Sequence, residues 1–170
     1  MKRIFISLFT LLLIGLAVES NAQNEKFKAL FMYNFTKYIE WPSGMESGEF
    51  VIGILGSSPM KKELDIISSK KKVSDQPIKV KVYNSINDIG GCHILFIPTE
   101  KSASLESAQA QTKGKGTLII TDKPGLGRKG AGINYIISGG RQDFEINIKT
   151  FEEQRLKVNA ALYSLGKVVN

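Results

Sequence analysis

The glycine-rich segment at residues 125–130 is the part of the sequence closest to a cofactor-binding motif. Its residues, GLGRKG, match the G-x-G-x-x-G pattern of dinucleotide-binding loops and follow a predicted strand. In such proteins the pattern must open a helix, because the helix N-terminus binds the pyrophosphate. Here residues 131–136 lead into another predicted strand. We therefore predict a flexible hairpin loop and no nucleotide cofactor.

His93 and Cys92 are the only histidine and the only cysteine of the chain. One histidine cannot form a histidine-based zinc cluster, and a catalytic triad would also need a nucleophile and an acid beside it. Since His93 adjoins an apolar run, we expect a core histidine with satisfied hydrogen bonds. One cysteine excludes an intramolecular disulfide. Cys92 is predicted to be a small buried hydrophobic residue, with a reactive thiol or an intermolecular bridge as alternatives.

The carboxylates Glu100, Asp122 and Asp143 lie apart in the sequence, and no pair of them is marked for acid and base roles. We therefore expect a protein that is not an enzyme and has no catalytic residues, cofactor or metal. If a small ligand binds, the carboxyl ends of the strands would form its crevice, as in other open α/β sheets. The predicted crevice residues are Ser57, Ser58, Thr99, Glu100 and Asp122.

Residues 25–41 are predicted to form an amphipathic helix that Pro42 ends. The apolar residues that recur at steps of three and four are Phe27, Leu30, Phe31, Phe35, Tyr38 and Ile39. Asn34 lies within this stripe, and it is either a buried amide bonded to the backbone or a contact to a partner. The neighbouring aromatic residues either pack in the core or contact that partner. The candidate partner-contact residues are Tyr33, Asn34, Tyr38 and Trp41.

Six segments are predicted to form strands, at residues 50–55, 78–83, 92–97, 117–121, 133–138 and 144–148. Residues 92–97 and 117–121 are continuously apolar, which indicates strands covered on both faces. Residues 78–83 alternate, which is typical of a half-exposed strand. Gly139 and Gly140 suit a tight reversal between the last two strands.

Three further helices complete the predicted order. Pro59 begins one, with Ser58 as its cap, and this helix runs to about Lys70. Residues 103–112 form another. Thr150 and Glu153 form a capping box that opens a last helix, whose apolar stripe extends to Val169. The order predicts an α/β fold: a three-layer mixed sheet flanked by helices, with an antiparallel edge hairpin and a C-terminal helix.

Residues 1–22 have the composition of a cleavable secretory signal peptide. Lys2 and Arg3 precede an apolar run from Ile4 to Val18, and small residues precede a cut after Ala22. The alternative is a membrane anchor, but spanning takes roughly twenty apolar residues and this run has fifteen. We expect cleavage, no stable membrane insertion, and a single domain over residues 23–170 in the periplasm.

The chain carries 23 lysines and arginines against 16 acidic residues, a formal charge of +7. The leader takes Lys2, Arg3 and Glu19 with it, so the charge of the processed chain falls to +6. The cations are scattered and are not interleaved with aromatic residues as on a nucleic-acid-binding face. We expect a solvated surface and no nucleic-acid partner, with anionic lipid or an acidic partner as the alternative.

Five blocks of the sequence occur in an order shared with one known family. They are residues 29–42 (ALFMYNFTKYIEWP), 51–56 (VIGILG), 92–97 (CHILFI), 117–122 (TLIITD) and 144–147 (FEIN). The aromatic segment that ends in Trp41-Pro42 and the FEIN strand are fairly specific. On these blocks, nearly the whole processed chain resembles the YfiR-like family of periplasmic regulatory proteins.

This resemblance implies a periplasmic regulator that acts by binding protein. In the family's best-known role the protein represses an inner-membrane diguanylate cyclase through that enzyme's periplasmic domain, which lowers cyclic di-GMP and biofilm formation. The resemblance also implies a homodimer. Members can carry stabilising cysteine pairs, whereas this chain has only Cys92, so redox control through an internal disulfide does not carry over. The alternative function is a periplasmic small-molecule-binding sensor module.

Overall fold

The computed structural model describes residues 23–170, and the predicted signal peptide lies outside them. In this part of the chain an eight-stranded mixed sheet has the order β10-β8-β7-β6-β5-β2-β4-β3, and β1 pairs with β9 in a two-stranded sheet. The strands are β1 (Ile39–Glu40), β2 (Phe50–Leu55), β3 (Lys72–Val73), β4 (Gln76–Tyr83), β5 (Ile94–Ile97), β6 (Leu118–Thr121), β7 (Ile133–Ser138), β8 (Arg141–Asn147), β9 (Lys157–Val158) and β10 (Lys167–Val169). None of the described helices has the length and apolar character needed to cross a membrane.

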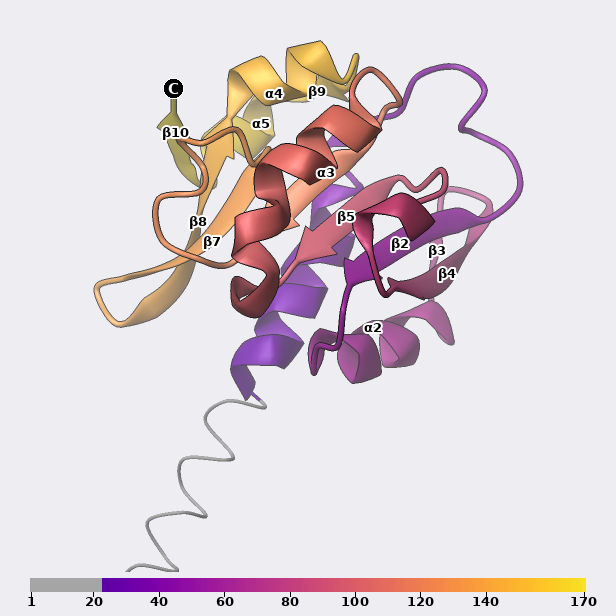
Figure 1. The fold of residues 1–170 in the computed structure, drawn as a ribbon, viewed down its shortest axis with the longest axis horizontal. Helices are drawn as coiled ribbons and strands as arrows, with labels where there is room; N and C mark the ends of the chain where they lie inside the picture. The colour runs from indigo at the N-terminus through magenta and orange to yellow at the C-terminus, as the bar shows by residue number, and fades with distance from the viewer. Residues whose placement is uncertain (1–22) are drawn as a thin grey trace, which may run out of the picture.

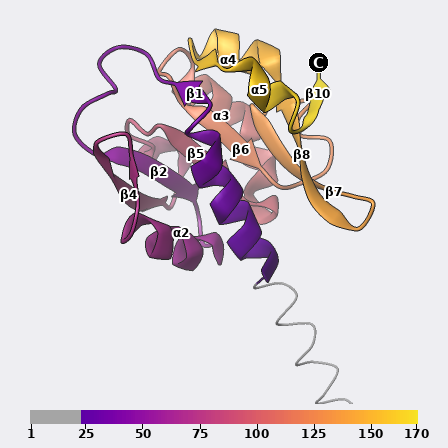
Figure 2. The same cartoon turned by 180° about the vertical axis from the view of Figure 1, so that it is seen from behind.

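Two apolar clusters cover the two faces of the large sheet. Alternate residues of β2 separate between them: Ile52 and Ile54 belong to one cluster, Val51 and Leu55 to the other. The N-terminal helix (residues 23–35) and α2 (Met60–Ser68) pack on the first face, and α3 (Leu105–Thr112) packs on the second. Figures 1 and 2 show these helices on opposite sides of the sheet. The predicted three-layer α/β fold is confirmed.

The predicted strands of the sheet are found where the apolar patterns indicated them. Strands β5 and β6 are buried along their whole length, and β4 alternates between buried and exposed residues near its start. Strands β7 and β8 pair antiparallel through Gly139 and Gly140, whose positive φ angles a two-residue turn of this hand requires. Strand β10 pairs with β8 in parallel, so the hairpin lies one strand in from the edge of the sheet.

The N-terminal helix is shorter than predicted and is rotated relative to its predicted apolar stripe. It ends at Phe35, and a turn leads into β1, which pairs with β9 through Ile39 and Val158. This pairing with a distant segment overrides the local helical period. The buried face includes Lys28 and Met32, whereas Phe27 and Leu30, both in the predicted stripe, are exposed.

The single C-terminal helix that was predicted from Thr150 is wrong. Asn147, not Thr150, caps α4 (Ile148–Glu153), and the chain then forms β9, α5 (Ala160–Tyr163) and β10. Helix α4 ends because Arg155 adopts a positive φ of 57°, while Leu156 N–H donates to Phe151 O at 2.9 Å. This closure usually uses glycine at the left-handed position, so its arginine gave no stop signal.

The other helices differ from prediction only near their ends. Helix α2 begins at Met60, whose N–H donates to Ser58 Oγ at 3.2 Å, and it ends at Ser68. The helix predicted over 103–112 is a 3-10 helix, η2 (Thr99–Ser104), that continues into α3. A second short 3-10 helix, η1 (Ile86–Asp88), follows β4.

Candidate functional site

The residues of the predicted ligand crevice lie at one edge of the sheet. Strands β2, β5 and β6 are parallel neighbours, so their carboxyl ends meet there. The structure joins two of the five residues: Thr99 Oγ1 donates to Asp122 Oδ1 at 2.9 Å. Ser58 instead bonds the first turn of its own helix, and Ser57 and Glu100 are exposed.

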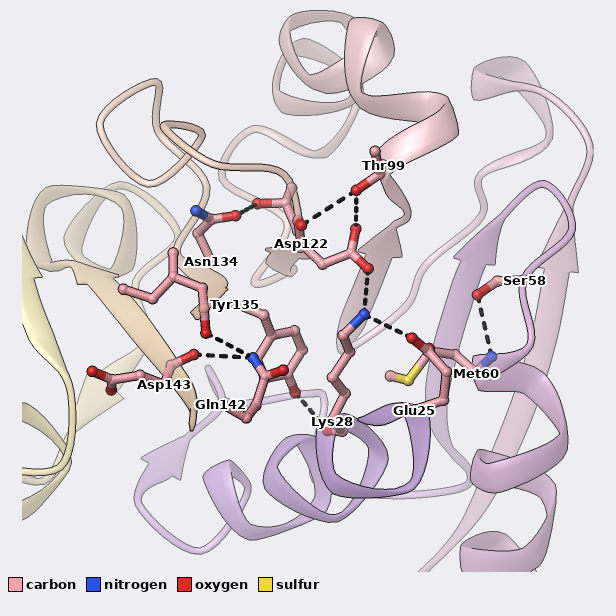
Figure 3. A network of polar contacts seen from close by, with 12 residues as sticks. Glu25, Lys28, Ser58, Met60, Thr99, Asp122, Asn134, Tyr135, Gln142 and Asp143 are labelled. Atoms are coloured by element: carbon pink, nitrogen blue, oxygen red, sulfur yellow. Dashed lines mark hydrogen bonds and ion pairs between the residues drawn. The ribbon is translucent and has the colours of Figure 1, made fainter. Parts of the chain in front are cut away.

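The first turns of the N-terminal helix complete this site with a buried ion triad (Figure 3). Lys28 Nζ lies 2.7 Å from Glu25 Oε1 and 2.7 Å from Asp122 Oδ2. The side chains of Lys28, Glu25 and Asp122 are only 9, 15 and 12% exposed. Burial by itself lowers the pKa of Lys28, but the hydrogen bonds and charges of Asp122 and Glu25 outweigh burial and raise that pKa above 10.5. The lysine is therefore charged at neutral pH, and its contribution to stability is lost only as the pH rises through the raised pKa.

Tyr135, on β7, forms a hydrogen bond to the backbone of the same helix. Its hydroxyl donates to Lys28 O at 2.6 Å, and its ring is fully buried on the helix-covered face of the sheet. Burial, with the charges of Asp122 and Glu25, raises the pKa of Tyr135 well above 10.0, so the phenol stays a donor. Beside this contact is a cleft of about 440 Å³ whose lining includes Lys28, Asp122, Tyr135, Gln142 and Glu145.

A second polar chain crosses the sheet next to the triad. Thr121 Oγ1 donates to Asn134 Oδ1 at 2.7 Å, and Asn134 Nδ2 donates to Glu145 Oε2 at 2.8 Å. Both Thr121 and Asn134 are fully buried. Each of these side-chain groups therefore has the partner that a buried polar group requires.

The glycine-rich segment is not a hairpin loop, because β6 and β7 on either side of it pair in parallel. It is a crossover connection whose backbone carbonyls accept hydrogen bonds from side chains. Asn147 Nδ2 donates to Gly127 O at 2.9 Å, Thr150 Oγ1 to Gly130 O at 3.1 Å, and Gln109 Nε2 to Lys129 O at 3.0 Å. A strand, β7, follows it, so the segment lacks the helix N-terminus of a dinucleotide site.

The second candidate site is an apolar groove between the N-terminal helix and the β7–β8 hairpin, here called the helix–hairpin groove. It consists of two adjoining hollows of about 490 and 360 Å³, which share Phe31 and Gln142. Phe27, Ile137 and Leu165 are 46, 63 and 54% exposed at its walls. Other lining residues are Asn34, Lys37, Tyr38, Arg141 and Asp143. Exposed apolar residues that cluster around a groove are typical of interaction sites.

The candidate partner-contact residues lie in three places. Asn34 and Tyr38 line the helix–hairpin groove. Tyr33 lies on the other side of the helix and donates to Lys72 O at 3.3 Å. Trp41 is half-buried: its Nε1–H donates to His93 O at 3.2 Å, and its ring packs edge-on against Phe50 at 4.9 Å.

His93 is a satisfied core histidine, as predicted. Val51 N–H donates to Nδ1 at 3.0 Å, so Nε2 carries the proton that bonds Met45 O at 2.8 Å. The ring also stacks on Phe50 at 4.3 Å. Burial lowers the pKa of His93 below 6.5, although the bond to Met45 acts in the opposite direction.

This environment predicts a pH-dependent stability. The unfolded histidine gains a proton near pH 6.5 while the folded one resists it, so the free energy of unfolding should be constant above that pH and fall below it. Urea unfolding measured across this range checks the prediction. In a His93→Asn variant, which is less stable at neutral pH, this part of the slope should disappear. An unchanged slope in that variant would assign the effect to other groups.

Sequence reasoning missed Glu25 and Lys28 of the triad and Phe27, Ile137 and Leu165 of the groove. One signal was available for Lys28, which lies four residues before Met32 and seven before Phe35 on the buried face. A lysine at that spacing indicates a buried partner of opposite charge. The groove residues gave no signal, because their exposure depends on how the hairpin lies beside the helix.

The fold and these sites define a class of protein: an α/β domain with a helix-covered mixed sheet, a closed polar network at the strand ends and an exposed apolar groove. Comparison with known families places it more closely. A family profile described as YfiR/HmsC-like matches residues 25–167, and the chain belongs to that family. A search of curated proteins finds no match to the chain.

Proposed function

We propose that this protein is a periplasmic regulator that binds the periplasmic domain of an inner-membrane signalling enzyme and represses it. A diguanylate cyclase is the candidate enzyme. Family membership over residues 25–167 is the observation that carries the proposal. The predicted signal peptide supports the location, because a protein outside the inner membrane reaches cytoplasmic signalling only through a spanning partner.

The helix–hairpin groove is the proposed contact surface. It offers aromatic and other large apolar side chains to a partner, and a few well-packed side chains carry most of the binding energy at protein interfaces. Regulation by contact rather than by catalysis also agrees with the polar network at the strand ends. Its donors and acceptors bond one another and hold the fold together.

Introducing charge into the groove should weaken capture of the partner. Replacing Ile137 and Leu165 with aspartate places two carboxylates in an apolar contact, and we expect at least a thirtyfold loss of affinity, about 2 kcal/mol. The measurement is capture of the detergent-solubilised cyclase by the purified protein. The matched control carries Val82→Asp and Val168→Asp, because these valines are 40 and 46% exposed and line neither hollow of the groove.

The cellular readout tests repression itself. Deleting the gene should raise cyclic di-GMP and biofilm formation, and the wild-type gene should restore both. The Ile137→Asp, Leu165→Asp variant should fail to restore them although it is exported and folded. Unchanged cyclic di-GMP after deletion, together with no captured membrane protein, would contradict the proposed function.

A second candidate function is a periplasmic small-molecule sensor, which the cleft of about 440 Å³ beside Lys28 and Tyr135 favours. A ligand in that cleft would raise the melting temperature, because it binds only the folded chain. A thermal-shift screen of small metabolites checks this function. The homodimer that the resemblance implies also stays a proposal.

A further inference from the structure

One edge of the sheet carries a large share of the protein's excess positive charge. Residues 60–83, which form α2, β3 and β4, hold seven lysines and three acidic residues, a net charge of +4 against +7 for the whole chain. Two of the lysines are paired: Lys61 with Asp65 at 2.6 Å and Lys79 with Glu49 at 3.0 Å. The other five are exposed and form no ion pair within the described chain. They are Lys62, Lys70, Lys71, Lys72 and Lys81. Lys81 alternates with Val80 on β4 and so lies on the face of the sheet opposite to α2. The other four, on α2 and the segment that follows it, are here called the lysine edge.

The stability of the fold accounts for some of these lysines but not for all of them. Lys72 lies on the outermost strand, where a lysine discourages pairing with another chain. Lys70 and Lys71 follow the C-terminus of α2, where cations offset the helix dipole. Neither reason applies to Lys62, which is exposed on α2.

The kind of cation indicates the kind of partner. Residues 60–83 contain no arginine, the side chain that protein interfaces favour because its planar group bonds carboxylates in a fixed geometry. Lysine is depleted at protein interfaces, and it acts as a point charge. A group of lysines therefore suits a surface of many mobile negative charges. Ile66, which is 44% exposed one helical turn after Lys62, adds an apolar contact.

We infer that the lysine edge docks the protein on an anionic phospholipid surface. Each lysine near such a surface contributes about 1 kcal/mol to binding without shape complementarity. The attachment is peripheral, and the fold stays outside the hydrocarbon.

The position of the lysine edge fits a protein that also binds a partner. In the sheet order it lies at the β4–β3 end, whereas the helix–hairpin groove lies at the β7–β8 end (Figure 1). Lipid contact therefore leaves the groove uncovered. Under the proposed function it would hold the regulator beside its membrane partner, but lipid binding itself requires no partner.

Vesicle flotation with the purified, processed protein tests this inference. At low salt the protein should float with vesicles of phosphatidylglycerol and phosphatidylcholine but not with phosphatidylcholine alone. Raising the salt to about 0.5 M should release it, because screening shortens the reach of its charges. Replacing Lys70, Lys71 and Lys72 with glutamine should weaken binding about a hundredfold.

The matched control removes the same charge elsewhere, by replacing Lys113, Lys115 and Lys129 with glutamine; all three are exposed. This control should keep most of the affinity. No binding at low salt, equal binding to both kinds of vesicle, or equal loss in both triple variants would overturn the inference. Because the assay contains no enzyme, these outcomes are independent of the proposed repression.

Discussion

Replacing Lys28 with methionine should lower the free energy of unfolding by about 3–5 kcal/mol. The ammonium lies 2.7 Å from both Glu25 and Asp122, and all three side chains are largely withdrawn from water. Methionine fills similar space but leaves two carboxylates facing each other without a cation. Urea unfolding at neutral pH measures the loss, and an unchanged m value would show that the folded state keeps its compactness.

Two variants separate charge from packing at this position. Lys61→Met breaks an ion pair of 2.6 Å whose members are about half exposed, and it should cost no more than about 1 kcal/mol. Adding Glu25→Gln and Asp122→Asn to Lys28→Met removes the uncompensated charge and should restore much of the stability. The account of the triad fails if Lys28→Met costs no more than Lys61→Met.

Replacing Phe35 with alanine should also cost about 3–5 kcal/mol. This ring is 2% exposed, and it packs edge-on against Phe144 with 4.8 Å between ring centroids and stacks near Tyr135 at 6.2 Å. Alanine would leave a cavity between the end of the N-terminal helix and the β7–β8 hairpin. Chemical denaturation again gives the size of the loss.

Phe27→Ala is the control for this second change, because it removes the same ring from the same helix. Phe27 is exposed at the groove, so its loss should change the free energy of unfolding by less than about 1 kcal/mol. It should nevertheless weaken binding of the groove's partner. Equal destabilisation by the two variants would mean that the helix does not bury the face described above.

The large sheet was predictable because its strands have strong local patterns. The apolar residues 92–97 and 117–121 indicated central strands, and Gly139-Gly140 indicated the hairpin. The C-terminal segment was not predictable. Val158 and Val168 fit a helical stripe in sequence. In the structure, however, Val158 pairs with Ile39 in one sheet, and Val168 pairs with Ile146 in the other. Such pairings join distant segments, and local periodicity carries no information about them.

The candidate site was predictable only at its strand ends. A general rule for α/β sheets placed Thr99 and Asp122 at one edge, and the structure joins them. Lys28 lies 94 residues before Asp122 in the sequence. Their contact depends on how the N-terminal helix crosses the sheet. The helix–hairpin groove depends on the same crossing, so its walls could not be identified from spacing.

In the exported protein that we propose, the pairing of β1 with β9 would set an order of folding events. Ile39 meets Val158, and Lys28 meets Asp122, so the N-terminal segment, which would cross first, has its partners far along the chain. Contacts between such distant segments form late, because the intervening chain must first be available. Under that proposal the N-terminal segment would stay unfolded until residues 157–158, which form β9, have crossed the membrane.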